Sequence, residues 1–302
     1  MSEDLFREED LGSLFKKSKK REIKKCIVCS STEFSIWSES RHYSSYKCNS
    51  CALIFMSPQL CEEGLADYYN NYIGRRRSSD KEKMSLRAKQ YKLDSIPIRD
   101  FLSDGKILDV GCNGGFFLNE LGDSYERFGT EIDPEAMNYA KNNYPDIATN
   151  IHLGSLESVG FEKSTFNLVS MRGVIEHVMD PEATIAEVSR ILANKGLLFI
   201  CATPNGESLA AELYRENWTL FHPVQHLWHF SSKNLSEICE RHNLKLVWKE
   251  YPYLGTPYEN VSEDIKKVAN KINNLENNIE SDDISPPFYE SMLTLMFEKH
   301  AI

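Results

Sequence analysis

The sequence predicts an α/β protein whose core is a doubly wound, mostly parallel sheet, with a small cysteine-rich module in front of it. From about residue 103 onward, short apolar runs alternate with amphipathic helical segments, which is typical of β-α-β units. Two CxxC pairs lie within residues 26–51, before this alternation begins. At 302 residues the chain is long enough for one such core and a small additional module.

Six segments are candidate strands, because each is a short apolar run bounded by polar or turn-forming residues. They are residues 106–110, 127–132, 166–171, 196–203, 244–250 and 290–299. The last two flank a polar insertion at 257–286, which contains a short heptad seam. The seam consists of Val261, Ile265, Val268, Ile272, Leu275 and Ile279. It predicts an amphipathic helix lying on its own domain, and the alternative is a contact with a second copy in a homodimer.

The N-terminal part of the chain divides by composition. Residues 1–24 are mostly charged and predict a flexible arm, whereas 25–60 contain short alternating runs typical of a small ribbon. Residues 61–102 predict bridging helices, and 103–302 form the α/β domain. In the bridge, Tyr68, Tyr69 and Tyr72 predict either a lid over a bound ligand or core packing. The arginine run at 75–77 predicts either a diphosphate contact or a solvated loop.

Charge and hydropathy exclude several classes of partner. The chain has 35 Lys and Arg against 45 Asp and Glu, and a formal net charge of -10 disfavours nucleic acid. No apolar run is long enough to cross a bilayer, and the acidic first residues do not resemble a secretory signal. We therefore expect a cytoplasmic protein that acts on a small molecule and binds neither nucleic acid nor membrane.

The two CxxC pairs predict a metal site. Cys26 and Cys29 form one pair, and Cys48 and Cys51 form the other. Two such turns can supply the four thiolates of a tetrahedral Zn²⁺ site, which would be closed to water and therefore structural. Iron in the same geometry or unligated thiols are the alternatives. Four further cysteines lack paired spacing and are expected to be small hydrophobic residues, namely Cys61, Cys112, Cys201 and Cys239.

A glycine-rich turn follows the first strand of the α/β domain. Gly111, Gly114 and Gly115 let the main chain approach a ligand closely at the start of a helix. Glu131 ends the next strand, 22 positions after Asp109, where a carboxylate can bind both hydroxyls of an adenosine ribose. The alternative is a turn that only packs the helix on the strand.

These residues and the segment 166–181 resemble the motifs of class I S-adenosylmethionine-dependent methyltransferases. The resemblance extends from about residue 100 to the end of the sequence. The resemblance implies a Rossmann-like, seven-stranded sheet and S-adenosylmethionine as cofactor. It places the methionine part on the turn and the adenosine near Glu131, although the usual carboxylate near the adenine is missing. The implied cofactor contacts are Asp109, Gly111, Cys112, Asn113, Gly115, Glu131, Ile132, Ser155, Leu156, Arg172 and Tyr69.

Glu176 and His177 follow the 166–171 strand, at the edge of the sheet where ligands of open α/β folds bind. A histidine there suits a general base, so His177 is the first candidate, and holding its loop is the alternative role. His226 is the second candidate for base or substrate contact, whereas His222 and His229 are expected to be surface or capping residues. Related quinone and RNA methyltransferases bind Mg²⁺ with an acid where Gly173 stands here. A catalytic metal is therefore not expected, although Glu176, His177 and His226 could form a weak site.

The complete layout resembles a subgroup in which a zinc ribbon precedes the methyltransferase domain. The marks are the CxxC pairs and the segments 55–58, 67–72, 203–205 and 226–231. The substrate of this subgroup is often a sugar or glycan precursor, which implies O-methylation of a nucleotide-linked or precursor sugar in polysaccharide biosynthesis. The alternatives are a small-molecule or quinone-type O-methyltransferase and a catalytically silent binding protein.

Overall fold

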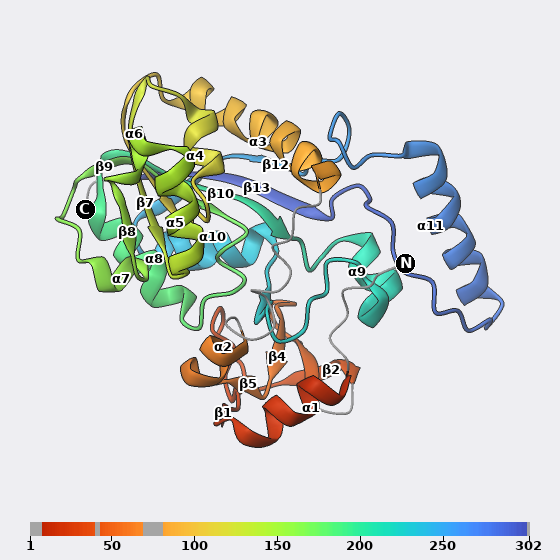
Figure 1. Cartoon of the computed structure of the whole chain (residues 1–302). Coiled ribbons are helices and arrows are strands. Elements are labelled where there is room, and N and C mark those ends of the chain that lie inside the picture. Colours follow the sequence, from red (N-terminus) through yellow and green to blue (C-terminus); the bar gives the residue numbers. More distant parts are fainter. Residues whose placement is uncertain (1–7, 40–42, 69–80, 301–302) are drawn as a thin grey trace.

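The computed structural model describes residues 8–39, 43–68 and 81–300, and its largest element is a seven-stranded sheet. The strands lie in the order β12-β13-β10-β9-β6-β7-β8 (Figure 1). Neighbouring strands are parallel, except that β13 runs antiparallel to both β10 and β12. The bounds are β6 Gly105–Val110, β7 Tyr125–Glu131, β8 Ile151–Leu153, β9 Phe166–Arg172, β10 Leu192–Pro204, β12 Leu244–Glu250 and β13 Met292–Lys299. The predicted mostly parallel α/β fold is confirmed.

Six of these strands coincide with the six apolar runs of the sequence, with small shifts at their ends. In β6, β9 and β10 the side chains are largely buried, which explains their near-continuous apolar runs, whereas only Leu244 of β12 is buried. The seventh, β8, was not expected. It has three residues, of which only Ile151 is buried, so it shows neither a continuous run nor an alternation.

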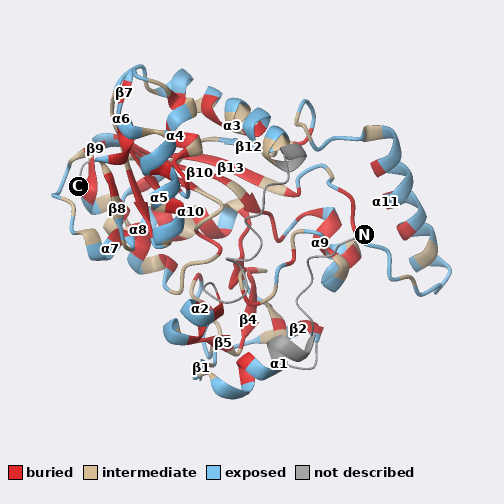
Figure 2. Cartoon of the chain, in the orientation of Figure 1, coloured by how far each residue is buried: buried red, intermediate tan, exposed pale blue. Residues whose placement is uncertain are grey.

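Helices cover both faces of the sheet (Figure 1). Because successive strand residues point to opposite faces, Ile107 and Leu108 belong to different core clusters. One face is covered by α3 Lys81–Phe101, α4 Phe116–Leu121, α5 Pro134–Asn143 and α6 Pro145–Ala148, and the other by α7 Leu156–Val159, α8 Pro181–Ile191 and α10 Ser232–Arg241. Figure 2 shows the buried strands between these two layers. No helix in the described ranges is both long and apolar enough to cross a bilayer.

The cysteine-rich module forms a small antiparallel sheet that the α/β domain completes. The module supplies β2 Phe34–Glu39, β3 Ser44–Cys48 and β4 Ile54–Ser57, and it lies below the large sheet in Figure 1. The fourth strand, β11 Trp228–His229, comes from the segment before α10 and pairs with β4. Residues 25–60 therefore share their sheet with a distant segment of the chain instead of forming a ribbon alone.

The structure differs from the flexible arm expected at the N-terminus. Within the expected range 1–24, α1 spans Glu8–Lys17, and β1 Lys20–Arg21 pairs with β5 Gln59–Leu60. Leu14 and Phe15 are buried in the main core cluster. Two apolar side chains thus dock a helix that is rich in charged residues, and composition alone does not reveal this contact.

The bridge between the modules is only partly described. It contains α2 Glu62–Tyr68 and the long helix α3. Tyr69, Tyr72 and the arginine run at 75–77 lie outside the described residues. Tyr68 is buried, and its hydroxyl accepts a hydrogen bond from Gln225 Nε2 at 2.9 Å. Of the two expectations for this tyrosine, the structure therefore favours core packing.

The insertion forms α11 Val261–Glu276, which packs on α9 Leu209–Tyr214 beside the short 3₁₀ helix Arg215–Asn217. Val268 is buried in this contact. Ile265, Ile272 and Leu275 are 47%, 36% and 49% exposed, however, so the heptad seam is only partly covered by its own domain.

Candidate active site and metal centre

The glycine turn begins where β6 ends, at the centre of the sheet. Gly111 and Gly115 adopt positive φ angles of 67° and 76°, a conformation that side chains strongly disfavour. A Cβ at Gly114 would lie 2.8 Å from ring atoms of both Phe116 and Tyr139. Asn113 adopts φ 51°, which asparagine tolerates better than most residues and which explains why it can replace glycine in this turn.

Glu131 holds the turn in place from the neighbouring strand. One carboxylate oxygen accepts the main-chain N–H of Asn113 at 2.7 Å, and the other accepts that of Asp133 at 2.9 Å. The Glu131 carbonyl also accepts the N–H of Gly154 at 2.8 Å, which brings the end of β8 alongside. The turn, Glu131 and the segment after β8 are thus joined at one edge of the sheet, as the sequence predicts.

The remaining predicted cofactor contacts lie around this edge in different environments. Ile132 is 62% exposed, and Ser155 caps α7. Cys112 and Leu156 are buried, and the main-chain N–H and carbonyl of Cys112 bond to Thr130 and Gly115. Leu153 was not predicted, yet it is 53% exposed at the end of β8, and the signal that reveals it is an exposed apolar side chain beside Glu131.

Asp109 and Arg172 lie at the carboxyl ends of the two central strands. Asp109 is buried and accepts the hydroxyl of Ser170 at 2.6 Å, and burial raises the pKa of its carboxyl group to about 7. Arg172 Nε donates to Asp94 of α3 at 2.7 Å, and its guanidinium lies 4.5 Å from the centre of the Tyr91 ring. The structure therefore engages Arg172 with α3 more closely than with the glycine turn.

The loop after β9 brings Glu176 and His177 together with His226. Their ligand-capable atoms all lie within 4.8 Å of one another. His177 Nε2 is 3.9 Å from Glu176 Oε1, and the rings of His177 and His226 are 4.7 Å apart. The sequence predicted these three residues as the catalytic set, and the fold places them in one cluster.

Hydrogen bonds orient the imidazole rings of this cluster. His177 Nδ1 lies 3.0 Å from the Gln225 carbonyl, and His226 Nδ1 lies 3.0 Å from the Leu220 carbonyl. Because a carbonyl only accepts, each neutral ring carries its proton on Nδ1, and Nε2 keeps a lone pair that can accept a proton or bind a cation.

Burial shifts each of the three pKa values in the direction that favours the neutral side chain. It lowers the pKa of His177 to about 4 and holds the pKa of His226 well below its usual range. It also raises the pKa of Glu176 to about 7, although Thr203 donates its hydroxyl to the carboxylate at 3.1 Å. Both imidazoles are therefore neutral near pH 7.

The two other histidines of this region differ from each other. His222 is exposed, which agrees with the surface role expected of it. His229 lies in β11, is 1% exposed and is surrounded by the rings of Trp37, Trp218 and Phe221. Neither of its ring nitrogens has a hydrogen-bond partner among the described residues, so it is a core residue, and the expected surface or capping role is wrong.

A cavity of about 360 Å³ lies at the carboxyl ends of β9 and β10, beside this cluster. Arg172, Ala202 and α3 form one side of it. The segments before and after α11 form the other side, and most of their lining side chains are apolar or aromatic. These lining residues are Pro252, Tyr253, Thr256, Tyr258, Pro286, Pro287, Phe288 and Ser291, and Thr219, Leu220 and Met292 complete the lining. The segments that flank α11 thus supply one wall of the cavity.

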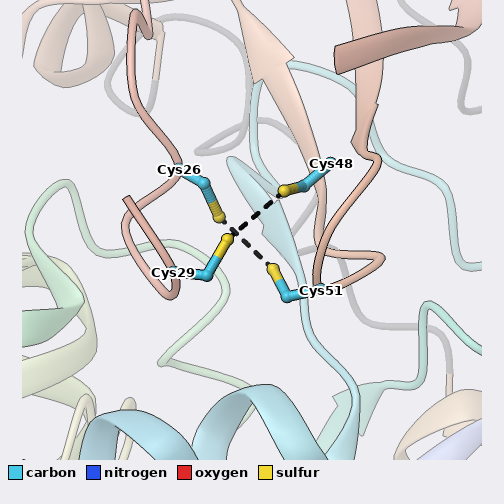
Figure 3. A group of neighbouring side chains, drawn as sticks. All are labelled: Cys26, Cys29, Cys48 and Cys51. Carbon is cyan, nitrogen blue, oxygen red and sulfur yellow. Dashed lines mark hydrogen bonds between the residues drawn. The ribbon is translucent and has the colours of Figure 1, made fainter. Parts of the chain in front are cut away.

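The four cysteines of the CxxC pairs converge on one point (Figure 3). The sulfur atoms of Cys26 and Cys51 are 3.4 Å apart, those of Cys29 and Cys48 are 3.5 Å apart, and all four lie within 4.8 Å of one another. Zn–S bonds of about 2.3 Å in a tetrahedron require sulfur atoms about 3.8 Å apart, so the cluster fits a zinc ion. The four cysteines without paired spacing are unbridged thiols, and three of them are buried, as expected.

Comparison with known proteins identifies the α/β part of the chain. The family model for methyltransferase domains matches residues 82–249. Ubiquinone biosynthesis O-methyltransferase of Xanthomonas oryzae pv. oryzae is 30% identical over 130 residues, which are 39% of this chain and 53% of that protein. The Colwellia psychrerythraea protein of the same name is 29% identical over 114 residues, or 36% and 46%. The chain therefore spans about half the length of the curated relatives it matches.

Solved structures share the fold at low sequence identity. The YcgJ protein of Bacillus subtilis superposes with a TM-score of 0.51 at 15% identity, covering 70% of this chain and 99% of that one. A chain in the complex of the Haloferax volcanii Trm112 methyltransferase activator superposes with a TM-score of 0.56 at 15% identity, covering 78% and 98%. At this identity the likeness concerns the fold alone.

Proposed function

The chain belongs to the family of methyltransferase domains, and from this premise we propose that it transfers the methyl group of S-adenosylmethionine to an oxygen atom of a small molecule. The observation that carries the proposal is the pairing of Glu131 with the glycine turn, a short distance along the sheet edge from the Glu176, His177 and His226 cluster. S-adenosylmethionine supplies a methyl group that its sulfonium already activates.

The cofactor side of the proposal rests on three groups. The Glu131 carboxylate receives the ribose hydroxyls, and the turn from Gly111 to Gly115 lies against the methionine part. Ile132 and Leu153 expose apolar surface beside Glu131, which suits the flat face of an adenine. Without the carboxylate expected near the adenine, this apolar contact and the main chain at Ser155 remain to bind it.

His177 is the proposed base. Its Nε2 accepts the proton of the acceptor hydroxyl while the oxygen attacks the methyl group, and the Nδ1–H bond to the Gln225 carbonyl keeps the ring in the required tautomer. Glu176, 3.9 Å away, stabilises the imidazolium that forms. The His226 ring lies edge-on to the His177 ring, 4.7 Å away, and is the second proposed contact of the acceptor.

The acceptor is proposed to be a hydroxyl on an apolar ring, of the kind that a quinone-type O-methyltransferase uses. The cavity supports this reading because Tyr253, Phe288 and several prolines line it, and because the charges of Asp94 and Arg172 at its wall pair with each other. The names of the curated relatives agree with it. The sugar acceptor rests only on the resemblance of the ribbon-containing layout.

The cysteine cluster is proposed to hold one structural Zn²⁺. Four thiolates complete the coordination, so a closed site of this kind contributes to folding and has no open position for substrate.

Isothermal titration with S-adenosylmethionine and S-adenosylhomocysteine tests the cofactor site, and both should bind with micromolar affinity. Methyl transfer is then measured with 3,4-dihydroxybenzoate and with UDP-glucose as acceptor probes. We expect methylation of the catechol only. Methylation of the sugar alone would replace the proposed acceptor, and absence of binding to both adenosyl compounds would refute the enzyme itself.

A further inference from the structure

The peptide of Leu227 lies between the cysteine-rich module and the loop that carries Glu176. Its N–H donates to the main-chain carbonyl of Glu176 at 2.8 Å. Its carbonyl accepts two hydrogen bonds from the module, one from the Met56 main chain at 3.1 Å and one from Gln59 Nε2 at 3.3 Å. Because Leu227 follows His226 directly, these three bonds fix the main-chain position from which the His226 imidazole extends.

Pairing with the module continues on both sides of this peptide. β11 pairs with β4 through Trp228 and Phe55, and the Val224 N–H donates to the Met56 sulfur at 3.0 Å. Asn234 Nδ2 donates to the carbonyl of Cys51 at 2.9 Å. The segment that carries His226 is therefore attached to the module that contains the cysteine cluster.

Gln59 also links the segment of His226 to the loop that carries Glu176 and His177. Its side chain is 1% exposed, and its Oε1 accepts two hydrogen bonds from Arg21, at 3.0 and 2.7 Å. The same guanidinium donates to the carbonyl of Met179, two residues beyond His177. One buried amide thus joins the segment of His226 to the loop of Glu176 and His177.

We propose that Gln59 is a positioning residue and that the cysteine-rich module, closed by its metal, holds His226 in place against Glu176 and His177. The rate effect rests on the proposed function. Misplacing a catalytic group by about 1 Å can cost about 10²-fold in rate, and loss of an outer-shell partner typically costs about 10- to 100-fold. Cofactor binding does not involve these bonds and should be unaffected.

The test is Gln59→Glu in the full chain, because glutamate keeps the size and the acceptor for Arg21 but cannot donate to Leu227. We expect kcat with 3,4-dihydroxybenzoate to fall at least about tenfold, with the Kd for S-adenosylmethionine within about twofold of wild type. Ser35→Ala is the matched control, because Ser35 lies in the same module and its hydroxyl donates to the exposed Asn49, and it should change neither value.

A second readout does not depend on catalysis. Amide hydrogen exchange at Leu227 and Trp228 should accelerate at least about tenfold in Gln59→Glu, and likewise in the wild type after a thiol reagent and chelator have removed the metal. If Gln59→Glu keeps both the kcat and the amide exchange rates of the wild type, the proposal is overturned. If the wild type methylates neither probe, the proposed function fails and exchange alone decides the positioning role. Should Gln59→Glu not fold, Gln59→Met takes its place, with the same outcomes.

Discussion

Glu131→Gln replaces the carboxylate at the centre of the proposed cofactor site by an amide of the same shape. In the folded chain each carboxylate oxygen already accepts a main-chain N–H, from Asn113 and from Asp133. In glutamine, an NH2 group replaces one of the two accepting oxygens. This NH2 group is a donor, and it then faces a main-chain N–H that is also a donor. The substitution therefore disturbs the glycine turn and also removes the charge that receives the ribose hydroxyls.

The magnitude follows from these bonds. A hydrogen bond to a charged group contributes about 1.5–3 kcal/mol. Loss of one ribose contact at this strength raises the Kd for S-adenosylmethionine about 10- to 150-fold, since about 1.4 kcal/mol corresponds to a factor of ten. The lost bond within the turn should also lower the melting temperature by several degrees.

Isothermal titration with S-adenosylmethionine measures the effect. Glu126→Gln is the matched control, because it makes the same change at the other end of β7, where the exposed carboxylate pairs with Lys106 at 3.5 Å. The control should bind like the wild type. Wild-type affinity in Glu131→Gln would show that this carboxylate does not contact the cofactor and would refute the assignment of the site.

Three further predictions concern the base, the buried carboxyl group and the metal. His177→Ala should lower kcat about 10²- to 10⁴-fold in steady-state assays, with cofactor affinity unchanged, and wild-type turnover would exclude this base. The pKa of Asp109 is raised from about 4 in the unfolded chain to about 7 in the fold, so the folded state binds more protons between these values. Stability should fall as the pH rises through this window, and urea titrations of Asp109→Asn should show a weaker pH dependence, whereas an unaltered profile would contradict the assignment. Metal analysis should find about one zinc per chain in the wild type and in Cys61→Ser but none in Cys48→Ser, and zinc retained in Cys48→Ser would contradict a four-thiolate site.

The cofactor half of the site could be predicted because its parts are local in sequence. A buried strand, a glycine turn and a helix follow one another directly, and Glu131 ends the next strand along the chain. In parallel β-α-β units the ends of neighbouring strands meet, so a separation of 22 residues already implies proximity. The CxxC spacing is local in the same sense, because two short turns each present a pair of thiols.

Short or sparsely apolar elements escaped the sequence pattern. β8 has three residues, and α1 docks through Leu14 and Phe15 within a charged segment. β8 is too short to show a periodicity, and α1 shows only one helical repeat, Leu11, Leu14 and Phe15, among charged residues. The seam of α11 was visible, but which of its apolar residues would be covered depends on α9, and only Val268 meets that helix closely enough to be buried.

The sequence by itself determined the fold class, the meeting of the glycine turn with Glu131 and the convergence of the four cysteine thiols, because strand pattern, turn chemistry and cysteine spacing act over a few residues. Only the tertiary structure decided that β11 completes the sheet of the cysteine-rich module and that Leu227 links this module to Glu176. A two-residue strand has no periodicity, and its partner lies about 170 positions earlier in the chain. Such pairing forms because the folded chain buries both strands and pairs their main-chain N–H and carbonyl groups.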